Sequence, residues 1–253
     1  MKQDYSPTEA IILAGGLGTR LHSVIQNIPK PMAPVRGRPF LEHLLDYWRV
    51  QGITRFILSV GYLAEIIQSH FGDQYHNCTV DYVVEACPLG TGGGIRQVLN
   101  QITLQQTRVV LINGDTWFTV DLPKLVQDAD RDDNLPITIA LKQLHQNDRY
   151  GSVKIDDHHR VKQFSAHATD GALINGGCYL LDVPAVTTSL RSYPDQFSLE
   201  RDYLEAMAIK GKVGASIQDG IFLDIGVPTD YQRAEQIIGE KHESNANIDS
   251  EHF

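Results

Sequence analysis

The sequence lacks the features of disulfide-stabilised and membrane-spanning proteins. It has three cysteines, Cys78, Cys87 and Cys178, an odd number without a C-x-x-C pair, which indicates neither a disulfide framework nor a zinc knuckle. No apolar run approaches the roughly 18 residues that a membrane span needs. The first nine residues, MKQDYSPTE, lack the apolar segment of a signal peptide, so we expect a cytoplasmic protein with reduced cysteines.

The sequence also has fewer basic than acidic side chains. Its 22 lysines and arginines against 31 aspartates and glutamates give a formal net charge of −9. This balance argues against a general binding surface for nucleic acids or anionic membranes. We therefore expect no nucleic acid and no membrane among the partners, and we expect any anionic ligand to be held by a local cationic site.

What the sequence does contain is an alternation of apolar, strand-like runs with amphipathic helical stretches, which is typical of β-α units that feed a parallel sheet. The first half predicts strands over 10–13, 56–60, 80–84 and 109–112, and helices that start near residues 40, 63 and 95. The second half predicts closely spaced strands over 137–141, 151–155 and 178–181, and 221–225 as a late strand. Strands without helices between them indicate hairpins, and hence a mixed sheet edge.

The chain is predicted to form a single domain over residues 1–239, because neither a linker nor an internal repeat interrupts it. Ser198 is expected to cap a helix that runs to about Ile209, and Pro228 is expected to start the final helix. The polar residues 240–253 are predicted to be a disordered tail.

A glycine-rich segment, Leu13-Ala-Gly-Gly-Leu-Gly-Thr-Arg-Leu21, directly follows the first predicted strand. Glycines there let backbone N–H groups approach phosphates closely, and Arg20 adds positive charge. Neither the P-loop pattern nor G-x-G-x-x-G fits the segment. A tight turn between a strand and a helix therefore remains an alternative interpretation.

The next segment fixes a lysine between two prolines. Pro29 and Pro31 remove backbone freedom on both sides of Lys30 and are expected to hold it in an extended segment, so that its ammonium group can serve as a rigidly placed cation.

Together the two segments resemble the sugar-1-phosphate nucleotidylyltransferases, whose signature is L-A-G-G-x-G-T-R-L followed closely by P-K-P. The resemblance continues through EACPLGTGG at residues 85–93, NGD at 113–115, NGG at 175–177 and FLDIG at 222–226. It implies an α/β fold of the nucleotide-diphospho-sugar transferase type, a Rossmann-like three-layer sandwich with a mixed, mainly parallel central sheet.

The resemblance implies attack by a sugar 1-phosphate on the α-phosphorus of a nucleoside triphosphate, with release of pyrophosphate. Because the nucleophile is already an anion, the chemistry requires cations and alignment rather than a general base. Arg20 is expected to steady the pyrophosphate portion, and Lys30 is expected to contact the reacting phosphates. The residues expected to bind the nucleotide are Leu13, Ala14, Gly15, Gly16, Gly18, Thr19, Glu85, Gly90 and Thr91.

A magnesium site is expected at Asp115 and Asp224, which match the family's carboxylate pair. Mg²⁺ is commonly held by one or two carboxylates together with phosphate oxygens. The alternative makes Asp115 a turn residue and Asp224 a satisfied carboxylate at a strand end.

Base recognition is expected at Glu85 and Gly90. The backbone of Gly90 matches a position close to the nucleobase, and Glu85 matches a position at the base edge. A carboxylate can accept hydrogen bonds from both N1–H and N2–H₂ of guanine, whereas uracil and thymine offer one donor each, so GTP is favoured. Glu85 as a solvated strand end is the alternative.

Sugar binding is expected at Tyr150, Gly151, Asn175 and Gly176. Here the sequence departs from the family, because many relatives carry Glu-Lys where this chain has Ala166 and His167. Alanine cannot bind a sugar hydroxyl, and an imidazole with a pKa near 6.5 is mostly neutral at pH 7. Glu200 and Asp202 are candidates to compensate, although carboxylates on a helix surface are the ordinary interpretation.

The segments PKPMAPV, GRPFLEHLLDYW, NGDTWFTVDL and FSLERDYL are most similar to the branch of the family that transfers GMP from GTP to D-glycero-α-D-manno-heptose 1-phosphate for surface polysaccharide. Alternatives are the same chemistry with another base or with mannose, glucose or N-acetylmuramate 1-phosphate, and a non-catalytic relative that binds nucleotide or sugar phosphate. A retaining glycosyltransferase is a third alternative, but no D-x-D follows a predicted strand. A homo-oligomer is compatible with the sequence.

Overall fold

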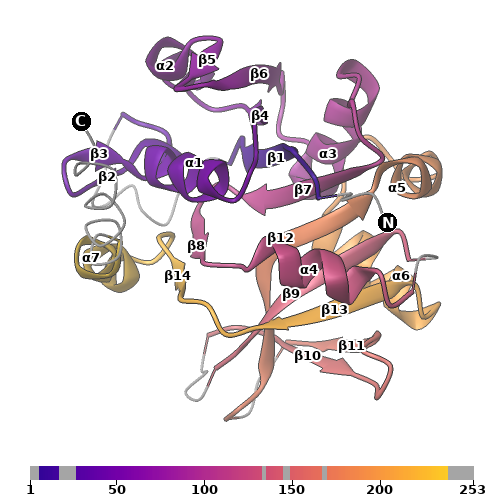
Figure 1. Cartoon of the computed structure of the whole chain (residues 1–253). Coiled ribbons are helices and arrows are strands. Elements are labelled where there is room, and N and C mark those ends of the chain that lie inside the picture. Colours follow the sequence, from indigo (N-terminus) through magenta and orange to yellow (C-terminus); the bar gives the residue numbers. More distant parts are fainter. Residues whose placement is uncertain (1–5, 17–26, 133–134, 145–148, 167–169, 239–253) are drawn as a thin grey trace, which may run out of the picture.

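The computed structural model describes residues 6–16, 27–132, 135–144, 149–166 and 170–238 (Figure 1). Gly18, Thr19, Arg20 and His167 of the predicted site, and the predicted tail, lie outside the described residues.

Four parallel strands form the centre of a ten-stranded sheet, in the order β7-β1-β4-β6. They are β1 (Glu9–Ala14), β4 (Arg55–Val60), β6 (Cys78–Val84) and β7 (Arg108–Asn113). The interiors of β1, β4 and β7 are almost wholly apolar, as expected for parallel strands that are covered on both faces, whereas β6, toward the sheet edge, is only partly buried.

Antiparallel pairing takes over beyond β7. Strand β12 (Leu173–Asp182) pairs antiparallel with β7 and with β9 (Ile137–Gln143), while β13 (Val213–Gln218) runs parallel to β9. The remaining strands of this sheet are β10 (Ser152–Ile155) and β11 (Val161–Ser165) at one edge and β5 (Gln74–Tyr75) at the other. The mixed, mainly parallel sheet expected from the sequence is confirmed.

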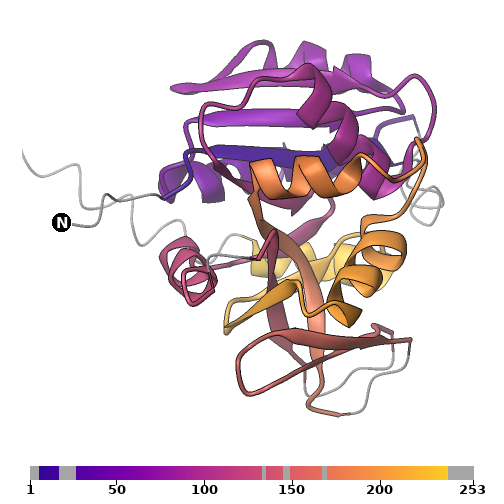
Figure 2. The same cartoon turned by 90° about the vertical axis from the view of Figure 1, so that its right-hand side faces the viewer.

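Helices cover both faces of the sheet, so the three-layer arrangement is confirmed (Figures 1 and 2). One core contains residues of α1 (Phe40–Val50), α2 (Ala64–Phe71), α4 (Leu122–Ala129) and α7 (Pro228–Ile237). The other contains residues of α3 (Gly90–Gln101), α5 (Val183–Leu190), a π-helix at Leu199–Leu204 and α6 (Glu205–Ile209). Side chains alternate along β1, with Ile12 in the first core and Ile11 in the second.

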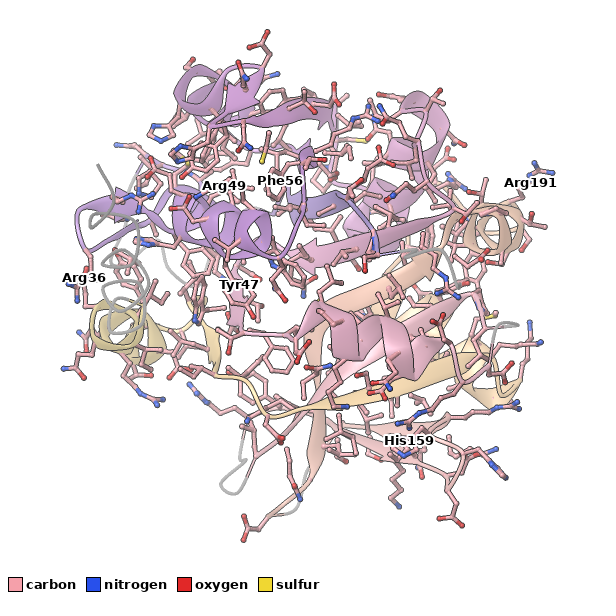
Figure 3. The ribbon with its side chains drawn as sticks, viewed as in Figure 1. Arg36, Tyr47, Arg49, Phe56, His159 and Arg191 are labelled. Atoms are coloured by element: carbon pink, nitrogen blue, oxygen red, sulfur yellow. The ribbon has the colours of Figure 1, made fainter. Side chains whose placement is uncertain are left out.

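A small two-stranded sheet lies beside the main one, and its second strand leads along the chain to α7. It pairs β8 (Thr116–Phe118) with β14 (Phe222–Asp224), and places Asp224 opposite Thr116. Tyr47 of α1, labelled in Figure 3, fixes the chain after β8 by donating a hydrogen bond to the carbonyl oxygen of Val120 at 2.8 Å. The position of β8 is thus set by the first helix.

Several elements differ from their sequence-based prediction. Helix α3 begins at Gly90, although its glycines suggested a start near residue 95, and the helix expected after Ser198 starts as a π-helix. Helices α4 and α5 and strand β13 were not predicted. In the part of the chain that the structure describes, no helix is both long and apolar enough to span a membrane.

Candidate active site

A cavity of about 450 Å³ opens at the carboxyl ends of β1 and β7, where open α/β sheets bind their ligands. It is lined by Leu13, Ala14, Gly15, Gly16, Lys30, Pro31, Glu85, Pro88, Gly90, Thr91, Asn113, Asp115 and Gly226. The described residues predicted for the nucleotide all lie in this lining, together with Lys30 and one predicted metal ligand. The structure therefore brings together segments that are far apart in the sequence.

Lys30 supplies a cation to the floor of this cavity. It starts a short 3₁₀ turn over Lys30–Met32, held by the Pro29 carbonyl, which accepts a hydrogen bond from Met32 N at 2.8 Å. Its Nζ atom lies 2.6 Å from Oδ2 of Asp115 and 3.4 Å from Oδ1 of Asp224, and its side chain is 8% exposed. The segment is therefore a 3₁₀ turn and not the extended stretch expected from the prolines, because the Pro29 carbonyl closes the turn.

The two carboxylates are held in place by the β8–β14 pair. Asp115 immediately precedes β8 and Asp224 ends β14, and the Ile225 N–H donates to the Asp115 carbonyl at 3.1 Å. The Gly226 N–H donates to Oδ1 of Asp224 at 2.7 Å. Gly226 is needed because a methyl group there would lie 2.2 Å from Nζ of Lys30. Two carboxylates separated by 109 positions thus converge on one positive charge.

Asp115 and Asp224 can hold one divalent cation only if both carboxylates reach the same point. The Lys30 ammonium shows that a cation can contact both carboxylates at one point. Among the described residues no group of three or more His, Cys, Asp or Glu side chains is placed to hold a metal ion. The pair therefore fits Mg²⁺ only if phosphate oxygens of a substrate complete the shell, which is the ion's common mode of binding.

Glu85 lies between two glycine-containing segments. Its Oε1 accepts a hydrogen bond from Oγ of Ser59 at 3.1 Å, and its Oε2 accepts one from Leu89 N at 3.2 Å. A methyl group at Gly15 would lie 2.6 Å from Oε1. These two donors orient the carboxylate and leave it acceptor sites for a ligand, since a carboxylate has about four lone-pair positions.

The glycines at the start of α3 make room for a distant segment of the chain. Gly90 has a φ of +74°, and the Phe197 carbonyl accepts hydrogen bonds from Gly92 N at 3.1 Å and Gly93 N at 3.4 Å. A methyl group at Gly92 would lie 2.1 Å from the Phe197 ring. The glycine run is therefore required for helix packing against residues 195–197, in addition to any role beside a nucleobase.

Glu200 is hydrogen-bonded to Thr91, which lines the cavity. Its Oε2 accepts hydrogen bonds from Oγ1 of Thr91 at 2.7 Å and from Oγ of Ser198 at 2.8 Å. Ser198 also caps the π-helix by accepting from Arg201 N at 3.2 Å, while Asp202 accepts from Ser198 N at 2.6 Å. Asp202 is thus part of the helix cap, whereas Glu200 lies beside the cavity.

Of the described residues, the four predicted for the sugar lie outside the lining of this cavity. The ring of Tyr150 packs edge-on against Phe222 at 5.4 Å, and Gly151 packs against Ser165, whose carbonyl oxygen would lie 2.6 Å from a methyl group there. Gly176 packs against the Phe118 ring.

Asn175 holds an irregularity in β12. It accepts from Gly177 N at 3.0 Å and donates to the Tyr179 hydroxyl at 2.9 Å. Burial first, and then the nearby Glu200 carboxylate, raise the pKa of Tyr179 well above its usual value. A methyl group at Gly177 would lie 2.7 Å from Nδ2 of Asn113, which lines the cavity. Gly177, which follows the predicted sugar residues Asn175 and Gly176 on β12, therefore packs against a residue of the cavity lining.

Four lining residues were not among the predicted site residues: Pro31, Pro88, Asn113 and Gly226. All four belong to the motifs that carry the family resemblance. Their place next to Lys30, Glu85, Asp115 and Asp224 in those motifs is the signal that would have found them.

A family model described as nucleotidyl transferase matches residues 9–241, which is most of the chain. The chain belongs to this family. The resemblance drawn from the two linked motifs is confirmed, and the family is one of enzymes.

Among its relatives is the D-glycero-alpha-D-manno-heptose 1-phosphate guanylyltransferase of Aneurinibacillus thermoaerophilus, which is 40% identical over 90% of this chain and 97% of the relative. The protein of the same name from Campylobacter jejuni is 42% identical over 88% of this chain and 96% of its own length. The crystal structure of HddC from Yersinia pseudotuberculosis complexed with GMP-PN has a TM-score of 0.79 at 36% identity, and the match covers 91% of this chain and 99% of that one.

Proposed function

We propose that this nucleotidyl transferase transfers GMP from GTP to D-glycero-α-D-manno-heptose 1-phosphate, releasing pyrophosphate. The single observation that carries the reaction class is that Lys30, which contacts both Asp115 and Asp224, lines one cavity together with Asp115 and the glycine-rich end of β1. The substrates are supported by two relatives at 40% and 42% identity whose names state this activity, and by the structural relative solved with GMP-PN.

The proposed mechanism depends on charge and alignment. The phosphate of the sugar attacks as an anion, so the residues have to bring two polyanions together and neutralise the charge that develops. Lys30 provides a fixed positive charge, and the backbone of residues 14–16 can approach phosphates closely because two of the three are glycines. No described side chain has to act as a general base.

Enzymes of this family generally use a divalent metal ion. For this chain we propose Mg²⁺, held by Asp115 and Asp224. When bound, the ion neutralises charge on the triphosphate and so favours attack at the α-phosphorus.

Recognition of the two substrates is assigned to two sides of the site. The nucleotide side comprises residues 13–16 and 85–91, with Glu85 proposed to accept from N1–H and N2–H₂ of guanine. The acceptor side comprises Tyr150, Gly151, Asn175 and Gly176. Its missing carboxylate at Ala166 is proposed to be replaced by Glu200, whose bond to Thr91 and proximity to Tyr179 support a place between the two sides.

The test is pyrophosphate release with Mg²⁺ from GTP, UTP, CTP, ATP or dTTP, each paired with D-glycero-α-D-manno-heptose, mannose, glucose and N-acetylmuramate 1-phosphates. We expect release with GTP and the heptose phosphate. Release with a different pair would discard these substrates and keep the reaction. Absence of release from every pair, by protein that binds GTP, would support a non-catalytic relative and overturn the proposal.

A further inference from the structure

The segment that carries Tyr150 is fastened to both ends of the stretch that carries Asp224. The ring of Tyr150 packs edge-on against Phe222 at 5.4 Å, two residues before Asp224. Nη2 of Arg149 donates to Oδ2 of Asp230 at 2.6 Å, six residues after Asp224. The Arg149 guanidinium also lies over the Tyr150 ring, 5.5 Å from its centroid. Residues 149–150 therefore bridge the strand and the helix that flank Asp224.

Asp230, which binds Arg149 at one end of this bridge, is buried and ion-paired. Its side chain is only 4% exposed, at the start of α7, and it forms ion pairs with Arg149 at 2.6 Å and with Arg233 at 3.2 Å. Arg233 lies on the same helix and its side chain is 61% exposed, whereas Arg149 comes from a segment 81 positions away. A buried carboxylate requires such partners, because an unpaired charge in the interior is strongly unfavourable.

The other end of the bridge is an aromatic contact with Phe222, the first residue of β14. Phe222 packs edge-on against Phe118 at 5.8 Å as well as against Tyr150, and these two rings hold the first residue of the strand that ends in Asp224. Since β14 has only three residues, its course is set by these contacts as much as by its pairing with β8.

We propose that Arg149 is a positioning residue, which links the acceptor side to Asp224 through Asp230 and Tyr150 without contacting the reacting atoms. The inference rests on the proposed function. Movement of residues 149–151 when a sugar phosphate binds would then be transmitted to Asp224. Because Asp230 keeps its ion pair with Arg233 when Arg149 is replaced, its buried carboxylate is not left without a partner, so loss of Arg149 should alter turnover more than folding.

The test compares Arg149→Met, Arg149→Lys and the matched control Arg233→Met in the full-length protein with GTP and the sugar phosphate identified above. We expect Arg149→Met to lower kcat by on the order of ten-fold or more, since small misplacements of reacting groups are costly, and to raise KM for the sugar phosphate. KM for GTP should change less than KM for the sugar phosphate, because the nucleotide-side residues 13–16 and 85–91 are untouched. Arg149→Lys should recover part of the loss, and Arg233→Met should match the wild type.

Thermal unfolding of each variant separates positioning from folding. Equal losses of kcat in Arg149→Met and Arg233→Met, or a loss that follows the melting temperature, would overturn the inference. So would equal changes in KM for both substrates. Combining Arg149→Met with Asp230→Asn adds a second check, because partners acting through one contact should lose less together than the product of their separate losses. Failure of the wild-type protein to turn over any pair would instead count against the proposed function.

Discussion

The proposed nucleotide side and the proposed acceptor side of the site are built in different ways. On the nucleotide side, backbone at the carboxyl ends of adjacent parallel strands faces the cavity directly, and the described residues predicted there all line it. On the acceptor side, antiparallel strands and aromatic rings hold Tyr150 and Asn175 behind the cavity lining. The first is a property of local segments, and the second is a property of contacts between distant ones.

This difference predicts which substitutions should affect the binding of which substrate. Changes at the end of β1 or in the 85–91 segment alter groups that face the cavity, so they should act on both binding and turnover. Changes on the acceptor side act through packing, so they should appear first in KM for the sugar phosphate. Lys30, Asp115 and Asp224, which contact one another, are proposed to serve both substrates.

The largest effect is expected for Lys30→Met. Loss of the only cation that contacts both carboxylates in the described site should lower kcat on the order of a hundred-fold or more, because a preorganised charge at the reacting phosphates is lost. Pyrophosphate release measures the effect, with far-UV circular dichroism to verify the fold. Lys162→Met, at an exposed strand position, is the matched control. Wild-type turnover in Lys30→Met would contradict the assigned role.

A large effect on stability is expected for Gly92→Ala. The added methyl group would meet the Phe197 ring, and overpacking of this kind costs about 1–3 kcal/mol. Urea unfolding should show the loss, and GTP affinity should fall because the 85–91 segment shifts. Gly16→Ala, with open space around its position, should retain the wild-type free energy of unfolding. Recovery in Gly92→Ala/Phe197→Leu would assign the loss to this contact, and no recovery would place it elsewhere.

A smaller and more selective effect is expected for Glu200→Gln. Removing the negative charge should raise KM for the sugar phosphate about ten-fold, the magnitude of one hydrogen bond to a charged group. KM for GTP should stay nearly constant. Glu205→Gln, an exposed change at the start of α6, controls for a general charge effect. Equal effects of the two variants would show that Glu200 does not distinguish the sides.

The smallest effect is expected in the pH dependence of stability, through His43 and the segment that follows Lys30. His43 is buried on α1 with Nε2 2.9 Å from the Val35 carbonyl, in the hairpin that follows Lys30, and burial lowers its pKa. The folded state therefore takes up a proton less readily than the unfolded chain. This contribution to stability is complete above about pH 6.5, the unfolded pKa, and decreases as the pH falls toward the folded pKa.

Urea unfolding of wild type and His43→Gln at pH 8, 7, 6 and 5 measures this contribution. We expect the free energy of unfolding to fall less steeply below pH 6.5 in the variant. Parallel curves for the two proteins would assign the acid sensitivity to other groups.

The sequence identified most of the residues that line the cavity, because their signals are local. Apolar runs identified β1, β4, β6 and β7, and parallel pairing then brings the residues that follow them to one edge of the sheet. Lys30 was recognisable from two adjacent prolines. The Ser198 cap was predicted correctly, because a serine side chain satisfies backbone donors one turn ahead.

The remaining features depend on contacts that no local pattern encodes. Helix α3 starts five residues early because Phe197 and Asp195 fill the space that its glycines leave, which sequence spacing does not show. The link from Arg149 to Asp230 joins charges 81 positions apart. Strand β13 was missed because Val213–Gln218 (VGASIQ) has only two larger apolar residues, and its Gly, Ala, Ser and Gln give a weak strand signal even though most of the segment is buried.

The packing of residues 195–197 onto the start of α3 also limits when this part of the structure can form during synthesis of the chain. Thr91 and Glu200 are 109 positions apart, so the wall they form cannot close until about four-fifths of the chain has been synthesised. Contacts this distant form late, since the loop between them must be ordered first. A nascent chain that ends before Phe197 would therefore contain the glycine-rich segment and Lys30 and still lack a finished nucleotide wall.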